Sequence, residues 1–98
     1  MEWEFNGVII EWRGPAPFLF ITTPPDVAAE IKDISPHVTY GWGCIPATAT
    51  IGDTEITTAL FPKNGGYLVP VKVAAQRAEN IGIGDTARVR LFIDLKLP

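Results

Sequence analysis

The sequence predicts a mainly β fold, a small barrel of six or seven strands capped by two short α-helices, in one domain over residues 1–98. Segments in which apolar and polar residues alternate recur along the chain, whereas only two short stretches have the apolar spacing of a helix. The 98 residues are 47% hydrophobic and 19% charged. This composition is sufficient for one hydrophobic core without disulfides or metal, and it excludes a disordered chain.

The N-terminal segment is predicted to form a strand over residues 2–12. Trp3 and Phe5 alternate with polar residues, as in a half-buried strand. After Gly7 the large apolar residues follow the opposite phase, and these are Val8, Ile10 and Trp12. We therefore expect a β-bulge at Gly7 that keeps both sets on one face. A second strand, apolar on both faces, is expected over residues 18–22.

The first helix is expected to begin at the segment Thr23-Pro24-Pro25-Asp26, with Thr23 as the N-cap and proline in the first turn. One side of this helix is apolar, formed by Val27, Ala28, Ile31 and Ile34. We expect the helix to end before Pro36.

The clearest hairpin lies at residues 45–60. Gly52-Asp53 has the composition of a two-residue turn, because glycine adopts positive φ without strain. The predicted partners on the apolar face are Ala49 with Ile56, Ala47 with Thr58, and Ile45 with Leu60. The opposite face pairs Thr48 with Thr57 and Thr50 with Glu55, and it is expected to be in contact with water.

The C-terminal third is predicted to contain a strand over residues 67–69, a helix and a final strand. Pro70 suits the first turn of the helix and Asn80 its end. The apolar stripe of this helix is formed by Val71, Ala74, Ala75 and Ala78. The final strand, from Ala87 to Leu97, has the longest unbroken alternation in the chain.

The segment Gly82-Ile83-Gly84-Asp85-Thr86-Ala87 formally matches a dinucleotide-binding motif. That motif binds pyrophosphate where it follows a strand and opens a helix. Here it follows a helix and opens a strand, and Asp85 adds a negative charge. We therefore expect a turn at this position, without a nucleotide.

The sequence offers few side chains for catalysis or metal binding. It contains one serine, Ser35, one histidine, His37, and one cysteine, Cys44. Ser35 and His37 flank Pro36, which places them poorly for a nucleophile and its base. Cys44 is expected in the core. A structural zinc site needs four Cys or His ligands, so we predict no catalytic residue, no metal and no cofactor.

The charge is unevenly distributed along the chain. The net charge is −3, but residues 1–59 carry eight acidic and two basic side chains, whereas residues 60–98 carry six basic and three acidic ones. Arg88, Arg90 and Lys96 fall on one face of the final strand. The negative total and the absence of a basic run make nucleic acid the less favoured partner.

Four groups of residues carry a resemblance to a known family. They are Gly41-Trp42-Gly43-x-Ile45-Pro46-Ala47-x-Ala49-Thr50-Ile51-Gly52, Thr58-Ala59-Leu60-Phe61-Pro62, Gly66-Tyr67-Leu68-Val69-Pro70-Val71-Lys72, and Gly84-Asp85. From about Phe5 to the last strand the chain resembles the domain of unknown function 1905 family of bacteria and archaea. The chain has Ile56 where members usually have Trp, and Ala59 where they usually have Ser.

The resemblance implies a double-split (pseudo) β-barrel and no established activity. The same fold class holds the AbrB/MazE-type swapped-hairpin DNA-binding domains, to which the order of strand, proline, helical Arg77 and Gly84-Asp85 is more weakly similar. Because the family has no known reaction, the resemblance transfers no catalytic residue to this chain.

We expect a non-enzymatic ligand-binding or protein-interaction module, as monomer or homodimer, whose partner is an unknown small molecule or protein. The residues expected to contact it are Trp42, Tyr67, Lys72 and Arg77. The alternative is a core position for Trp42 and a solvated helix face for Lys72 and Arg77. One alternative is an AbrB-like nucleic-acid-binding regulator. Another is an enzyme of unknown reaction, with a polar pocket formed by Thr48, Thr57, Thr58, Tyr67, Lys72 and carboxylates of the chain.

The expected location is the cytoplasm, without membrane association. The first residues are acidic where a signal peptide has basic ones, and a single cysteine suits a reducing compartment. The apolar runs are far shorter than the roughly 20 residues that a membrane-spanning helix needs.

Overall fold

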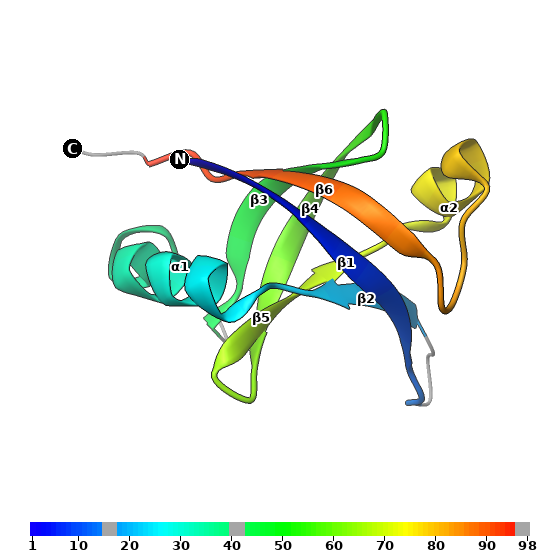
Figure 1. Cartoon of the computed structure of the whole chain (residues 1–98). Coiled ribbons are helices and arrows are strands. Elements are labelled where there is room, and N and C mark those ends of the chain that lie inside the picture. The colour runs from blue at the N-terminus through cyan, green and yellow to red at the C-terminus, as the bar shows by residue number, and fades with distance from the viewer. Residues whose placement is uncertain (15–17, 40–42, 96–98) are drawn as a thin grey trace.

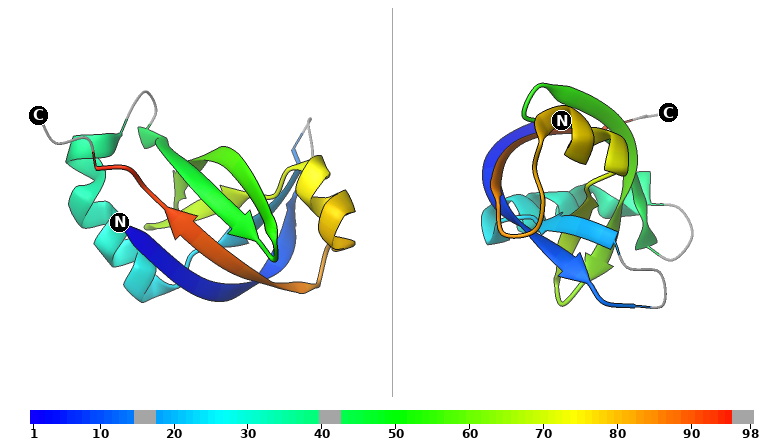
Figure 2. Two further views of the ribbon diagram at one scale, coloured as in Figure 1. Left: turned by 90° about the horizontal axis from the view of Figure 1, so that it is seen from above. Right: turned by 90° about the vertical axis from the view of Figure 1, so that its right-hand side faces the viewer.

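The computed structural model describes residues 1–14, 18–39 and 43–95, which form a closed barrel of six antiparallel strands (Figure 1). The strands are β1 (Glu2–Trp12), β2 (Phe18–Thr22), β3 (Ile45–Ile51), β4 (Thr54–Lys63), β5 (Gly66–Pro70) and β6 (Thr86–Phe92). Their order around the barrel is β1-β2-β5-β4-β3-β6. The described part of the chain also forms two helices, α1 (Pro25–Val38) and α2 (Val73–Glu79), which lie at opposite ends of the barrel (Figures 1 and 2). The predicted fold class is confirmed.

The β3–β4 hairpin has the predicted register, turn and faces. All seven pairs run from Ile51 with Thr54 to Ile45 with Leu60. Gly52 has a φ of 61°, as a two-residue turn of this kind requires. The inward side chains of β3 alternate with more exposed ones because successive residues of a strand point to opposite faces.

The bulge predicted at Gly7 is absent, so this prediction is wrong. The register of β1 with β6 is continuous from Glu2–Phe92 to Val8–Thr86. A Cβ atom at Gly7 would lie 2.3 Å from Cγ2 of Ile21, so a glycine is needed where the Ile21 side chain of the neighbouring strand β2 packs against β1. Without a bulge, three apolar residues of β1 remain on the outside of the barrel, namely Val8, Ile10 and Trp12.

Helix α1 differs from the prediction at both ends. Pro24 is its N-cap, while the hydroxyl of Thr23 bonds to Tyr67 in β5. The helix also continues through Pro36 to Val38. Proline removes one N–H donor from a helix, and the hydroxyl of Ser35 donates to the Lys32 carbonyl at 2.8 Å, the acceptor that the missing N–H would have used.

Helix α2 is shorter than predicted. Pro70 ends strand β5, and the helix begins at Val73. Ala75 is its one buried residue, whereas Ala74 and Ala78 of the predicted apolar stripe are exposed. Because α2 has only seven residues and lies at the end of the barrel, only Ala75 of the predicted helical stripe contacts the core from within the helix. Its end at Asn80 is confirmed, with a left-handed C-cap conformation.

The segment after α2 forms the predicted turn. Gly84 has a φ of 89°, and the Asp85 carboxylate accepts a hydrogen bond from the Gly82 N–H at 2.8 Å. The following strand β6 ends at Phe92, earlier than the predicted Leu97. Its buried residues, Ala87, Val89 and Leu91, alternate with exposed ones as in the predicted pattern, and Ile93 just beyond it is also buried.

The barrel consists of two copies of one β-β-α-β unit. Exchanging β1-β2-α1-β3 with β4-β5-α2-β6 leaves the order of strands around the barrel unchanged. Phe18 and Gly66 begin the two short strands, Pro25 and Val73 begin the two helices, and each pair is 48 residues apart. The bond from the Thr23 N–H to the Tyr67 carbonyl has its counterpart, at the same spacing, in the bond from Val71 to Leu19.

Each unit also attaches its helix to its long strand in a similar way. In the first unit the indole N–H of Trp3 donates to the carboxylate of Glu30. In the second, the hydroxyl of Thr54 donates to the carboxylate of Glu79 at 2.6 Å. Both helices are therefore held against the barrel by a glutamate, and each has a buried residue at the equivalent position, Val27 in α1 and Ala75 in α2.

Candidate binding site

The outside of the barrel carries an apolar surface over β1, β2, β5 and β4. We call this surface the outer apolar face, and it consists of Ile10, Trp12, Phe18, Phe20, Phe61 and Leu68. Phe20 and Leu68 are buried beneath their neighbours, and the other four side chains are exposed. The strand register brings these residues together, since Trp12 pairs with Phe18, Ile10 with Phe20, and Phe61 with Leu68. Exposed apolar clusters of this kind mark interaction sites in soluble proteins.

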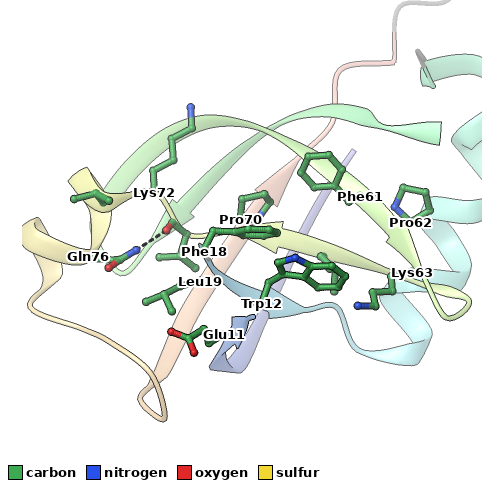
Figure 3. A pocket seen from close by; sticks show the side chains of 13 residues that line it. Glu11, Trp12, Phe18, Leu19, Phe61, Pro62, Lys63, Pro70, Lys72 and Gln76 are labelled. Carbon is green, nitrogen blue, oxygen red and sulfur yellow. Dashed lines mark hydrogen bonds between the residues drawn. The ribbon is translucent and has the colours of Figure 1, made fainter. Parts of the chain in front are cut away.

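A hollow of about 900 Å³, hollow 1, lies on this face beside the start of α2 (Figure 3). Trp12, Phe18 and Phe61 line it and remain 37%, 37% and 42% exposed. The Trp12 and Phe18 rings stack with centroids 6.3 Å apart, and the ammonium of Lys63 lies 3.5 Å from the centroid of a Trp12 ring. The strands thus hold the aromatic walls in place.

Most polar groups around hollow 1 already have partners. Lys72 donates to the carbonyl of Thr57. Gln76 donates to the carbonyl of Val71 at 2.8 Å, the dashed line in Figure 3. Glu11 forms an exposed ion pair with Arg13 at 3.5 Å. The walls themselves are mainly aromatic, aliphatic and proline side chains, so this hollow suits an apolar ligand.

A second hollow of about 600 Å³, hollow 2, lies on the same face beside α1. Ile10 and Phe20 line it, with Lys32 from α1 and the β4–β5 turn at residues 63–66. Lys63 and Leu68 line both hollows, so the two adjoin. Each hollow combines the hairpin end of one β-β-α-β unit with the helix start of the other, which makes them counterparts in the internal repeat.

Of the four residues predicted to contact a partner, the three that the structure describes, Tyr67, Lys72 and Arg77, do not come together. Trp42 lies outside the described residues. Tyr67 is 7% exposed and points into the core. Lys72 lines hollow 1, whereas Arg77 is exposed on α2 and lines neither hollow.

Sequence reasoning missed Trp12, Phe18 and Phe61. The signal was present in the alternation of Val8, Ile10 and Trp12. An alternating set shares one face of a strand, but the pattern does not say whether that face is inside or outside.

The threonine-based pocket of the enzyme alternative is not assembled. Thr48 and Thr57 are neighbours on the outside of the β3–β4 hairpin, while Tyr67 lies in the core. Cys44 is buried, as expected, and His37 is exposed in the last turn of α1. Within residues 1–14, 18–39 and 43–95, no three His, Cys, Asp or Glu side chains are placed to share a metal ion.

The opposite outer face, over β1, β6, β3 and β4, is polar. Arg88 forms a 2.7 Å ion pair with Glu4, whose carboxylate also lies 3.7 Å from Arg90. One carboxylate thus lies against both arginines of β6, and Lys96, the third cation predicted on this face, lies outside the described residues. A shallow hollow of about 380 Å³ lies here beside Arg90, Glu55 and the exposed ring of Phe92.

One carboxylate has a shifted pKa. The hydroxyl of Thr54 and the backbone N–H of Asp53 donate to Glu79, and these hydrogen bonds lower the pKa of the Glu79 carboxyl below its usual value. These hydrogen bonds join Glu79 of α2 to the β3–β4 turn, at the end of the barrel away from α1. The shifted pKa therefore reflects a contact that stabilises the fold.

Comparison with known proteins identifies the family. No helix in the described part of the chain is long and apolar enough to cross a membrane. No curated protein matches the chain at a significant level. The profile of the domain of unknown function 1905 (DUF1905) matches residues 5–91, nearly the whole chain, and the protein therefore belongs to the DUF1905 family.

Proposed function

We propose that the protein is a non-enzymatic binding module that holds an apolar, ring-bearing small molecule in hollow 1. The observation that carries this proposal is the group of three aromatic side chains, Trp12, Phe18 and Phe61, left more than a third exposed around one hollow. Small-molecule sites are typically concave and mostly apolar, with a few polar groups at their margins.

The energetic reason is the apolar surface that a ligand would remove from water. Each 100 Å² of apolar surface that becomes buried contributes roughly 2.5 kcal/mol. The aromatic walls stand on hydrogen-bonded strands, β1 with β2 and β4 with β5. Because these walls are already in position, a ligand loses little free energy in ordering them.

The polar groups around hollow 1 support binding rather than catalysis. The Lys72 ammonium and the Gln76 amide are engaged by backbone carbonyls. Nucleophilic catalysis needs a nucleophile and a base within hydrogen-bond reach. The described residues that line hollow 1 include no Ser, Thr, Cys or His, and its one carboxylate is Glu11.

Neither the nucleic-acid alternative nor the enzyme alternative has a comparable observation in its favour. Arg88 and Arg90, the basic pair on β6, both face Glu4. A surface that binds phosphates needs uncompensated positive charge.

A fluorescence titration with the neutral probe N-phenyl-1-naphthylamine tests the proposal. Phe61→Ala removes one wall of hollow 1, and Phe92→Ala is the matched control, because these rings are 42% and 43% exposed on opposite faces of the barrel. We expect the dissociation constant to rise at least about fivefold in Phe61→Ala, equivalent to about 1 kcal/mol, and to stay unchanged in Phe92→Ala. Absence of binding to the wild type, or equal effects of the two changes, would refute the proposal.

A further inference from the structure

The two hollows on the outer apolar face have similar frames but different chemistry. Hollow 1 has three exposed aromatic walls. Hollow 2 has two lysines, Lys32 and Lys63, and the described residues that line it include no carboxylate. A ligand that extends along this face therefore meets apolar rings at one end and ammonium groups at the other.

The internal repeat shows where this difference arises. Trp12 pairs with Phe18 at the end of the β1–β2 hairpin, and Lys63 pairs with Gly66 at the end of the β4–β5 hairpin. Since Phe18 and Gly66 occupy equivalent positions 48 residues apart, Trp12 and Lys63 are also counterparts. One hairpin end presents two aromatic rings, and the other presents an ammonium group and a glycine.

The ammonium groups in hollow 2 are available to an anion. Among the described residues, neither Lys32 nor Lys63 forms a salt bridge. Lys63 lies over Trp12, so its charge is at the junction of the hollows. Lys72, by contrast, is bonded to the Thr57 carbonyl. The chain as a whole has a net charge of −3, so two lysines without a carboxylate partner among the described residues are a local exception.

We infer that the ligand is an aromatic anion, with its ring in hollow 1 and its carboxylate, sulfonate or phosphate between Lys32 and Lys63 in hollow 2. This inference rests on the proposed function and names the class of ligand. Charge complementarity selects it: an anion adds charge-assisted hydrogen bonds with the two exposed ammonium groups, which a neutral ligand does not form.

Two probes with the same ring system test the inference. N-phenyl-1-naphthylamine is neutral, and 8-anilino-1-naphthalenesulfonate carries one sulfonate. We expect the wild type to bind the anionic probe about tenfold more tightly, since charge-assisted contacts of this kind contribute on the order of 1–2 kcal/mol. Raising the ionic strength should weaken the anionic probe alone, because salt screens exposed charges.

The variant Lys32→Gln removes one ammonium group of hollow 2. It should lower the preference for the anionic probe about three- to tenfold and leave the affinity for the neutral probe unchanged. Arg88→Gln is the control, because it makes the same change in net charge on the opposite outer face. Lys32 is exposed and forms no described salt bridge, so the fold should be retained.

The outcomes separate the inference from the proposed function. If both probes bind wild type equally, or Lys32→Gln and Arg88→Gln have the same effect, the inference is wrong while the proposed function stands. If neither probe binds, both are wrong. A preference for the anion that salt abolishes and Lys32→Gln reduces supports both.

Discussion

Thr23 joins the two repeats of the barrel, and its replacement by valine should destabilise the fold. It is 4% exposed and is the one buried polar side chain among the described residues. Its hydroxyl donates to the Tyr67 carbonyl at 3.2 Å and accepts from the Tyr67 N–H at 3.3 Å. The side chain therefore adds two hydrogen bonds to the backbone bond between Thr23 and Tyr67, next to the end of the β2–β5 pairing.

The magnitude follows from the groups left without partners. In Thr23→Val the Tyr67 N–H is buried without an acceptor, which costs about 1–3 kcal/mol. The Tyr67 carbonyl keeps its bond from the Thr23 N–H at 3.0 Å, and the added methyl offsets part of the loss. We expect a net loss of about 2 kcal/mol in the free energy of unfolding, or roughly 8–16 °C in Tm for a domain of this size.

Urea unfolding followed by circular dichroism measures this loss, and an unchanged m-value shows that the unfolded state is comparable. Thr23→Ser is the matched control, because it keeps the hydroxyl and removes only a methyl group. We expect it to cost about 1 kcal/mol. If valine is tolerated as well as threonine, or serine costs as much as valine, the hydroxyl does not stabilise the β2–β5 junction and the reasoning is wrong.

Two further predictions concern the frame of the barrel. Gly7→Ala should lower the free energy of unfolding in urea by about 1–3 kcal/mol, because the new Cβ would lie 2.3 Å from Cγ2 of Ile21. The control Gly82→Ala places no atom within 4 Å of the new Cβ and should change the free energy of unfolding by less than about 1 kcal/mol. Equal effects of the two changes would contradict the close approach of β1 and β2. The pKa of Glu79 is lowered by its hydrogen bonds from Thr54 and Asp53, so these bonds stabilise the fold at a pH above the ordinary pKa of a glutamate. This stabilisation is lost as the pH falls through the pKa that Glu79 has in the folded state. Wild type should therefore be more stable than Glu79→Gln at pH 7, and the difference should shrink in the acid range; a difference that is the same at pH 7 and pH 3 would exclude the carboxylate as its source.

Local patterns predicted much of the fold and little of the candidate site. The β3–β4 register followed from the alternation around Gly52-Asp53, because a two-residue turn fixes which residues face each other. The prediction that Trp42, Tyr67, Lys72 and Arg77 contact a partner rested on their residue types. Residue type does not show that Tyr67 points inward or that Lys72 bonds to the Thr57 carbonyl.

The internal repeat was also hidden from the sequence. Equivalent positions carry different residues, such as Trp12 and Lys63, or Phe18 and Gly66. The backbone of the β-β-α-β unit can be repeated with different sequences, because strand pairing at an exposed position is compatible with many side chains. The exposed side chains of the two units differ at the two hollows. A comparison of residue types at a fixed spacing therefore gives no clear signal.

The sequence by itself determined the family, the β-barrel class and the hairpin register, since each depends on motifs or alternation over a few neighbouring residues. Only the tertiary structure decided which face of β1 lies inside. Closure of the barrel brings Ile21 of β2 against Gly7, which keeps β1 in one phase. The same closure leaves Trp12 outside, beside Phe18 and Phe61, because a strand pattern defines two faces and packing against distant strands assigns one of them to water.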